Sequence, residues 1–254
     1  MPNAKYPDDI TELFDLSLTK TYAEMAEFYG VHENTVFKWC KKFGIVNRNG
    51  KRHRKYELNE DFFQTIDTPE KAYILGFFIA DGSVSDRSIC IGLHPQDKTH
   101  LVEIAYWMGS TAPIYDQKQS AESYVPDSYI VRINFSSLKI VDDLRALGVT
   151  NNKSLTVQYP TISSHLERHL IRGIWDGDGT IGPKRFECAG NRFILRGIQK
   201  AVKTHTGHVL THVKWYGHHR LMGYRRDKPV IHWLYEKATI RLHRKYISFL
   251  SYWR

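Results

Sequence analysis

The sequence has few cysteines, and they are not arranged to bind zinc or to build a disulfide framework. Only three occur in 254 residues, at Cys40, Cys90 and Cys188, and no two of them form a CxxC pair. Such scattered cysteines are typical of a reducing compartment. They argue against a zinc finger and against a small disulfide-stapled secreted domain.

Membrane-spanning and targeting signals are lacking as well. No apolar run is long enough to cross a bilayer. The N-terminal segment carries Asp8, Asp9 and Glu12, and acids at this place are wrong for a secretion signal or a mitochondrial presequence. We therefore expect the protein to stay in the cytoplasm of a bacterial or phage-infected cell.

Positive charge and aromatic residues are plentiful. Lysine and arginine number 36 against 27 aspartates and glutamates, so the net charge is +9 with histidine neutral. This surplus favours a polyanionic partner, and nucleic acid is the commonest one. With 42% hydrophobic and 13% aromatic residues, the chain can build a packed core in one large or two modest domains.

One segment, residues 169–181, reads as a helix that ends in acid. Gly173 and Gly177 are four apart and therefore lie on one helical face, where a second helix can approach closely. Asp178 and Gly179 fall where the helix should stop. A carboxylate at a helix C-terminus adds to the negative end of the helix dipole, so the site favours a cation.

The same pattern occurs earlier, in residues 72–84. Gly76 and Ala80 have the same spacing, and Asp81 and Gly82 follow them. The two copies are separated by the length of a domain, which indicates a duplication and not a short solenoid repeat. If the two small-residue faces pack on each other, the two aspartates emerge at one end.

Two carboxylates that share space raise each other's pKa unless a divalent ion neutralises them. Oxygen ligands suit Mg²⁺, and the backbone carbonyls of Ala80 and Gly177 lie beside the acids. The sequence therefore predicts a magnesium site at Asp81 and Asp178.

These two segments resemble the LAGLIDADG homing endonucleases, a family named for this helix. The matching stretches are Ile74 to Gly82 and Ile171 to Gly179. The resemblance implies that Asp81 and Asp178 are the catalytic metal-binding acids, with two or three divalent ions at the repeat interface. The family's earlier aspartate is present as Asp176.

The resemblance also implies an α+β fold of two αββαββα halves, related by a pseudo-twofold axis and forming a DNA-binding saddle. We expect the halves at about 62–150 and 151–254, in a monomer that binds a long, pseudo-palindromic DNA duplex. Periodicity predicts strands at residues 88–93, 112–118, 129–135, 185–189, 209–216 and 219–225. It predicts helices at residues 98–109, 138–147 and 193–205 and beyond 229.

The pattern of residues 1–46 predicts a separate helix-turn-helix DNA-binding domain, with Gly30 at the turn. On this interpretation Asn34, Thr35, Lys38 and Lys41 of the second helix face DNA. The expected core is Ala23, Ala26, Val31, Val36 and Trp39. A three-helix packing module with solvated lysines is the alternative.

Residues 47–61 read as a basic linker whose Arg48, Lys51, Arg52 and Arg54 would follow phosphates. A solvated tether is the alternative.

Other basic residues are candidates for contacts to DNA or to the scissile phosphate. We expect DNA-binding residues on a common sheet face at Lys118, Arg132, Lys214, Arg220 and Arg226. Because family members place a basic residue near the metals after the last strand of each half, Lys228 is the candidate catalytic lysine, with a solvated turn lysine as the alternative.

Taken together, the sequence predicts a magnesium-dependent, site-specific endonuclease that cuts both DNA strands. The alternative is a protein of the same fold that binds without cutting, as a regulator or as an RNA-splicing maturase.

Overall fold

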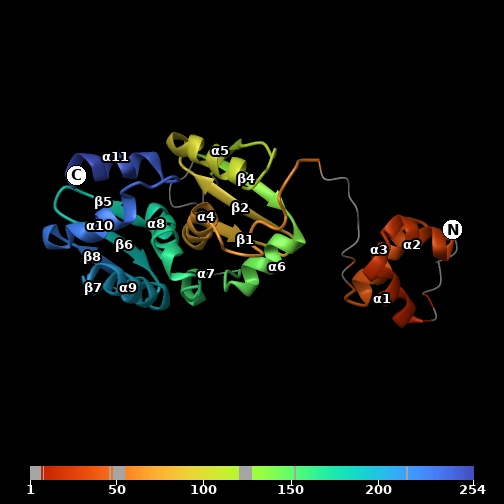
Figure 1. The fold of residues 1–254 in the computed structure, drawn as a ribbon. Coiled ribbons are helices and arrows are strands. Elements are labelled where there is room, and N and C mark those ends of the chain that lie inside the picture. The colour runs from red at the N-terminus through yellow and green to blue at the C-terminus, as the bar shows by residue number, and fades with distance from the viewer. Residues whose placement is uncertain are drawn as a thin grey trace. The chain divides into compact units, whose positions relative to one another are not determined.

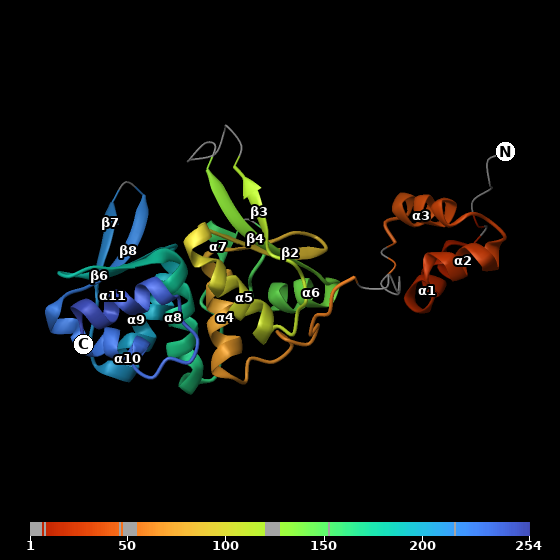
Figure 2. The ribbon, with the colours of Figure 1, turned by 90° about the horizontal axis from the view of Figure 1, so that it is seen from above.

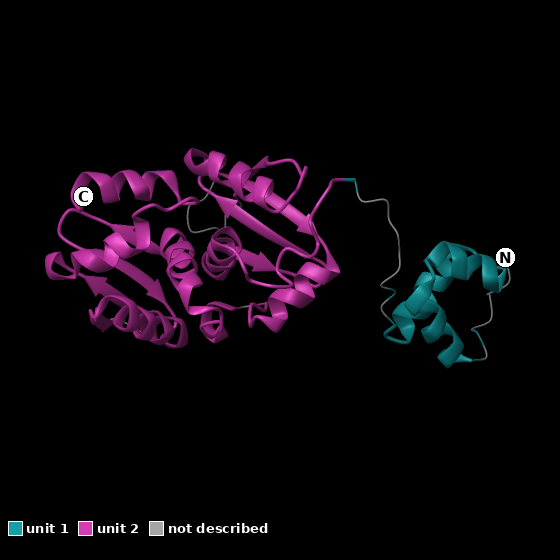
Figure 3. Cartoon of the chain, in the orientation of Figure 1, with its two compact units in different colours: residues 1–55 teal, residues 56–254 magenta. Residues whose placement is uncertain are grey.

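The computed structural model describes residues 7, 9–45, 47, 55–119, 128–151, 153–215 and 217–254. The chain forms two compact units, Met1–Lys55 (unit 1) and Tyr56–Arg254 (unit 2), shown in two colours in Figure 3. Over the described ranges, no helix has the length and apolar character that crossing a membrane requires.

Unit 1 contains helices α1 (Ile10–Thr19), α2 (Tyr22–Tyr29) and α3 (Glu33–Lys42). Thr21 and Glu24 form a capping box that starts α2, and Gly30 ends it in the left-handed region with φ 62°. These caps put Ala23 on the exposed side, so its predicted core position is wrong and Met25 is buried instead. The buried core is Leu13, Met25, Ala26, Val36, Trp39, Cys40 and Ile45.

Unit 2 repeats one order of elements twice (Figure 1). The first repeat contains α4 (Pro69–Ala80), β1 (Gly82–Val84), β2 (Ser88–Leu93), α5 (Lys98–Trp107), β3 (Tyr115–Lys118), β4 (Tyr129–Ser136), α6 (Leu138–Ala146) and α7 (Lys153–Thr156). The second contains α8 (Glu167–Asp178), β5 (Gly179–Ile181), β6 (Phe186–Gly190), α9 (Arg192–Thr206), β7 (Thr211–Trp215), β8 (His218–Gly223), α10 (Lys228–Tyr235) and α11 (His243–Tyr252). Because α7 follows α6 as α11 follows α10, we assign α7 to the first repeat.

Each repeat builds one antiparallel four-stranded sheet. The strand orders, β1-β2-β4-β3 and β5-β6-β8-β7, are equivalent, so the predicted α+β duplication is confirmed. Alternate residues of the central strands face the core, as in the pairs Ile89↔Phe135 and Ile91↔Ile133. Helices α5 and α6 pack on the first sheet and α9 on the second. The β3–β4 and β7–β8 pairs extend to the same side of unit 2 (Figure 2).

Helices α4 and α8 pack against each other at the centre of unit 2 (Figure 1). The contact requires glycine, because a Cβ on Gly76 would lie 2.0 Å from the carbonyl oxygen of Leu170, and a Cβ on Gly173 would lie 2.0 Å from that of Tyr73. Real side chains do not approach backbone so closely, and only glycine avoids the clash. The small-residue spacing that the two segments share therefore determines how the helices meet.

Candidate functional site

The paired helices deliver an acid each to the same end of the interface. Asp81 is the C-cap of α4, and Asp178 is the last residue of α8. A Cβ on Gly177 would lie 2.2 Å from Ala80 Cβ and 3.2 Å from Asp81 Oδ2. The Asp81 carboxylate thus lies against the residue that precedes Asp178. Both aspartates are exposed, so ligands can reach them.

The surrounding protein disfavours the charged form of both acids. Partial enclosure, followed by the negative charge of Asp178, raises the pKa of Asp81 to about 6. Enclosure also raises the pKa of Asp178. Two neighbouring carboxylates whose ionisation is disfavoured are stabilised by any cation that binds between them.

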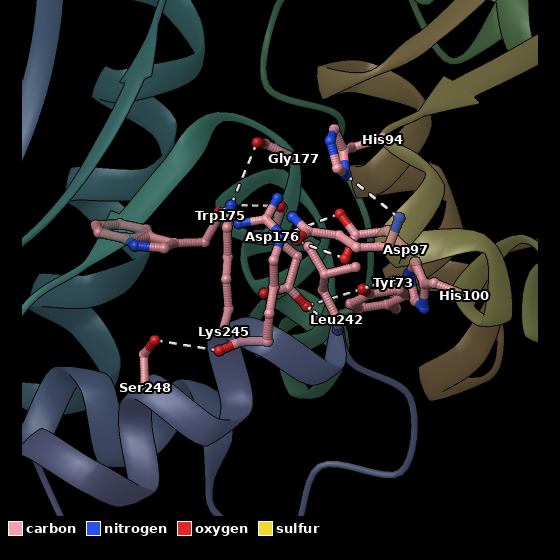
Figure 4. A network of polar contacts seen from close by, with 12 residues as sticks. Tyr73, His94, Asp97, His100, Trp175, Asp176, Gly177, Leu242, Lys245 and Ser248 are labelled. Atoms are coloured by element: carbon pink, nitrogen blue, oxygen red, sulfur yellow. Dashed lines mark hydrogen bonds and ion pairs between the residues drawn. The ribbon is translucent and has the colours of Figure 1, made fainter. Parts of the chain in front are cut away.

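Two buried lysines lie beside the acids. Lys153 Nζ donates to the carbonyl oxygen of Ala80 at 3.1 Å. Lys245 Nζ donates to the carbonyl oxygens of Trp175 at 2.9 Å, of Gly177 at 3.3 Å and of Asp176 (Figure 4).

These carbonyls lie in the last turns of α4 and α8, where the helix dipole is negative. The carbonyl oxygen of Trp175 also accepts a hydrogen bond from the Gly179 backbone N–H. The two lysines place positive charge at both helix ends.

The two lysines bring positive charge near both acids. Burial lowers the pKa of both ammonium groups, and the nearby carboxylates oppose this decrease. Among the cations that oppose the pKa increases of the acids, Lys245 has the largest effect on Asp81 and Lys153 the largest on Asp178. Both lysines therefore oppose the pKa increases of both acids.

The donor set suits a hard divalent ion. Within the described residues there is no cluster of three or more His, Cys, Asp or Glu side chains that could hold a metal alone. Mg²⁺ does not need such a cage, because it keeps several waters and uses one or two carboxylates together with substrate phosphates. Asp81 and Asp178 meet that requirement. The carbonyls of Ala80 and Gly177 accept lysine hydrogen bonds, and each keeps a second lone pair.

Comparison with solved structures identifies the fold. The homing endonuclease I-WcaI, bound to its DNA recognition sequence, superimposes with a TM-score of 0.52 at 11% identity, over 81% of this chain and 96% of that one. I-DmoI in complex with DNA and Ca gives 0.51 at 14% identity, over 76% and 99%. The chain has the LAGLIDADG fold.

The N-terminal LAGLIDADG domain of DUF199/WhiA gives a lower TM-score of 0.45 at 15% identity, over 69% of this chain and 85% of that domain. No protein-family model and no curated sequence matches the chain. The predicted LAGLIDADG helices are α4 and α8, so the motif lies where the fold places its paired helices.

The predicted catalytic lysine, Lys228, is exposed and contacts the C-terminal residue. It is the exposed first residue of α10, and its Nζ donates to the carbonyl oxygen of Arg254 at 3.4 Å. The lysines beside the acids are Lys153 and Lys245, which the sequence analysis missed. One signal could have found them, namely similar offsets from the acids in the two repeats: 72 residues (153 − 81) and 67 residues (245 − 178).

The register corrects the predicted common DNA-reading face in the first repeat. Arg132 pairs with Tyr115, and its Nη1 donates to Gln117 Oε1 at 2.8 Å, so these three share the open face of the sheet. Lys118 is one residue further along and lies on the opposite face, because side chains alternate along a strand.

The second repeat behaves in the same way. Arg220 donates to Glu187 Oε1 at 2.7 Å on the open face of the β5–β8 sheet. Lys214 pairs with His219 and lies on the opposite face. Arg226 lies outside the strands in a short 3-10 turn, Arg225–Asp227, and its side chain is 72% exposed.

In unit 1, the predicted recognition residues belong to α3. Asn34, Lys38 and Lys41 are exposed at positions that share one helical face, and Thr35 is half-buried. The linker residues Arg48, Lys51, Arg52 and Arg54 lie outside the described residues.

Proposed function

We propose that this protein is a site-specific DNA endonuclease that hydrolyses both strands of a duplex with divalent metal at Asp81 and Asp178. One observation carries the proposal. Two accessible carboxylates meet at the end of a glycine-packed helix pair, and two buried lysines donate hydrogen bonds to the backbone carbonyls that precede them. The LAGLIDADG fold supports this assignment, because I-WcaI and I-DmoI are DNA-bound homing endonucleases with it.

Hydrolysis of a phosphodiester forms a P–O bond to water and breaks a P–O bond to deoxyribose, while water loses a proton and the leaving oxygen gains one. Bound Mg²⁺ would supply an activated water and stabilise charge on the leaving oxygen. Asp81 and Asp178 hold the ions. Lys153 and Lys245 are the ammonium groups that offset the negative charge of the scissile phosphates. Because the two acids are quasi-equivalent, one acid serves each strand of the duplex.

DNA recognition belongs to the open sheet faces and to unit 1. Arg132 and Arg220 lie on the two open faces and are the basic residues best placed to reach base edges. Helix α3 of unit 1 adds Lys38 and Lys41 for phosphates or bases. Two similar sheets in one chain suit a monomer on a long, pseudo-palindromic duplex.

The experiment that tests the proposal is a selection from a randomised duplex library with Mg²⁺, followed by sequencing of the cleaved ends. Asp81→Asn and Asp178→Asn are the matched variants, since each removes one charge and keeps the side-chain shape. We expect sequence-specific cutting by the parent protein only, and DNA binding by all three proteins. Binding by the parent without any cutting would mean a DNA-binding protein of this fold that does not cleave.

The lysine assignment has its own comparison. Lys153→Met and Lys245→Met should each lower the cleavage rate at least about a hundredfold, the size of effect expected when one group that stabilises transition-state charge is removed. Lys228→Met should lower it much less. The opposite ranking would restore the role that the sequence indicated for Lys228.

A further inference from the structure

Asp176 is a buried carboxylate that does not face the metal-binding end of the helices. Its side chain is 0% exposed. It accepts hydrogen bonds from the Tyr73 hydroxyl at 2.8 Å and the Leu242 backbone N–H at 2.7 Å (Figure 4), and from the Tyr235 hydroxyl at 2.5 Å. Three donors compensate the buried charge. Burial and then the Asp176 charge hold the pKa of both tyrosines well above the usual range, so both remain donors.

The donors come from three separate segments. Tyr73 belongs to α4 of the first repeat, Tyr235 to α10, and Leu242 is the N-cap of α11. Asp176 thereby fixes the start of α11 to the middle of the helix interface. Lys245 lies in the first turn of α11, and its Nζ returns to the carbonyl oxygen of Asp176 itself.

A second contact holds the same turn of α11. Arg244 Nε donates to both carboxylate oxygens of Asp97, at 2.9 and 3.2 Å. Asp97 ends the 3-10 turn Pro95–Asp97 of the first repeat and is buried. The residue before Lys245 is therefore bound to the first repeat, while Lys245 itself is bound to the end of α8.

The first repeat lacks the equivalent anchor. Ile79 stands where the second repeat has Asp176, and an alkyl side chain cannot accept a hydrogen bond. In the described part of the chain, Lys153 Nζ donates one hydrogen bond to a carbonyl, whereas Lys245 Nζ donates three. Lys153 also belongs to a helix of only four residues.

We propose that Asp176 is a positioning residue that holds Lys245 in place through α11, and that the two lysines of the site are consequently fixed to different degrees. Since each lysine would serve one strand, removing Asp176 should slow the cutting of one strand more than of the other. This catalytic consequence rests on the proposed function.

A test that needs no metal or DNA is the rate of lysine acetylation by acetic anhydride in the folded, metal-free protein, measured peptide by peptide with mass spectrometry. In Asp176→Asn, we expect labelling of Lys245 to rise about tenfold relative to the parent, the effect of one lost hydrogen bond to a charged group. Labelling of Lys153 should stay within about twofold, since its Nζ is held by the carbonyl oxygen of Ala80 and not through α11.

Two further variants control for loss of stability. Ser137→Ala removes the cap of α6 in the first repeat and should not change Lys245 labelling. Tyr235→Phe keeps the carboxylate but removes one donor, and it should give a smaller rise in Lys245 labelling. It takes the place of Asp176→Asn if that variant does not fold. A rise of both lysines together in Asp176→Asn, or no rise at Lys245 in either Asp176→Asn or Tyr235→Phe, would overturn the positioning role.

The catalytic consequence is measured on a supercoiled plasmid that carries the selected target. We expect the Asp176→Asn variant to accumulate nicked circles, because one strand is cut more slowly, while the parent proceeds to linear DNA. Equal slowing of both strands would overturn the strand preference. If Lys245 labelling rises in Asp176→Asn as expected but the parent protein cuts no DNA, the proposed function is refuted and the positioning role of Asp176 stands.

Discussion

Gly173→Ala is the substitution that most directly perturbs the helix pair. The new Cβ would lie 2.0 Å from the Tyr73 carbonyl oxygen and 2.8 Å from the Phe77 backbone nitrogen. Neither atom can rotate away, since both are backbone. A carbon–oxygen contact needs about 3.3 Å, so α4 and α8 must move apart by roughly 1.3 Å. Asp81 and Asp178 must separate with them.

The magnitude follows from two opposing effects. Overpacking of this kind costs about 3 kcal/mol, and the better helix propensity of alanine offsets about 1 kcal/mol. We expect unit 2 to lose about 2 kcal/mol of unfolding free energy, which lowers its melting temperature by about 6 °C for a unit of this size. Cleavage should fall about a hundredfold, because a displacement of about 1 Å disrupts catalytic geometry.

The assay is urea unfolding followed by circular dichroism, together with the cleavage rate at a temperature where every variant is folded. Gly92→Ala is the matched control, since the nearest atom to its Cβ would be the flexible end of Ile130 at 3.2 Å, and the next, Arg132 Nε at 3.8 Å, is at ordinary contact distance. That variant should stay within about 0.5 kcal/mol of the parent. A Gly173→Ala protein as stable and as active as the parent would contradict the helix contact described above.

Three other predictions follow from the same contacts. The cleavage rate should fall about tenfold per unit as the pH drops below about 6, because protonation of Asp81, whose pKa is raised to about 6, removes the charge that holds a cation; a rate independent of pH from 5 to 8 would exclude this role. Arg172→Met should cost about 3 kcal/mol in urea unfolding, since the buried guanidinium donates to the carbonyl oxygens of Leu234 and Ile240, which would lose these donors; a loss below about 0.5 kcal/mol would show that the buried bonds contribute little. Lys38→Ala and Lys41→Ala should each reduce the salt dependence of DNA affinity by about 0.9 in log–log slope if α3 contacts phosphates, and unchanged slopes would remove α3 from the interface.

The sequence predicted the features that depend on local pattern. Small residues repeat at the same spacing in α4 and α8, and Asp81 and Asp178 each lie five residues after a glycine, Gly76 and Gly173 (81 − 76 and 178 − 173). A helix contact and a shared acidic end follow from that regularity alone, since periodicity determines which residues share a face.

The features that the sequence did not predict depend on tertiary contacts or on strand register. Lys153 and Lys245 are distant in sequence from the carbonyls that they bind, and the residues around a lysine do not indicate that it will be buried. Lys118 and Arg132 illustrate the second case, because a shift of one residue in register moves a side chain to the other face of the sheet.

Metal location is the measurement that bears most directly on the site. Crystals of the protein soaked in Mn²⁺ near pH 7.5 should give anomalous difference peaks within coordination distance of carboxylate oxygens of both Asp81 and Asp178. These peaks should disappear in the double variant Asp81→Asn, Asp178→Asn. Mn²⁺ bound only elsewhere, with both carboxylates free of metal at that pH, would contradict the account.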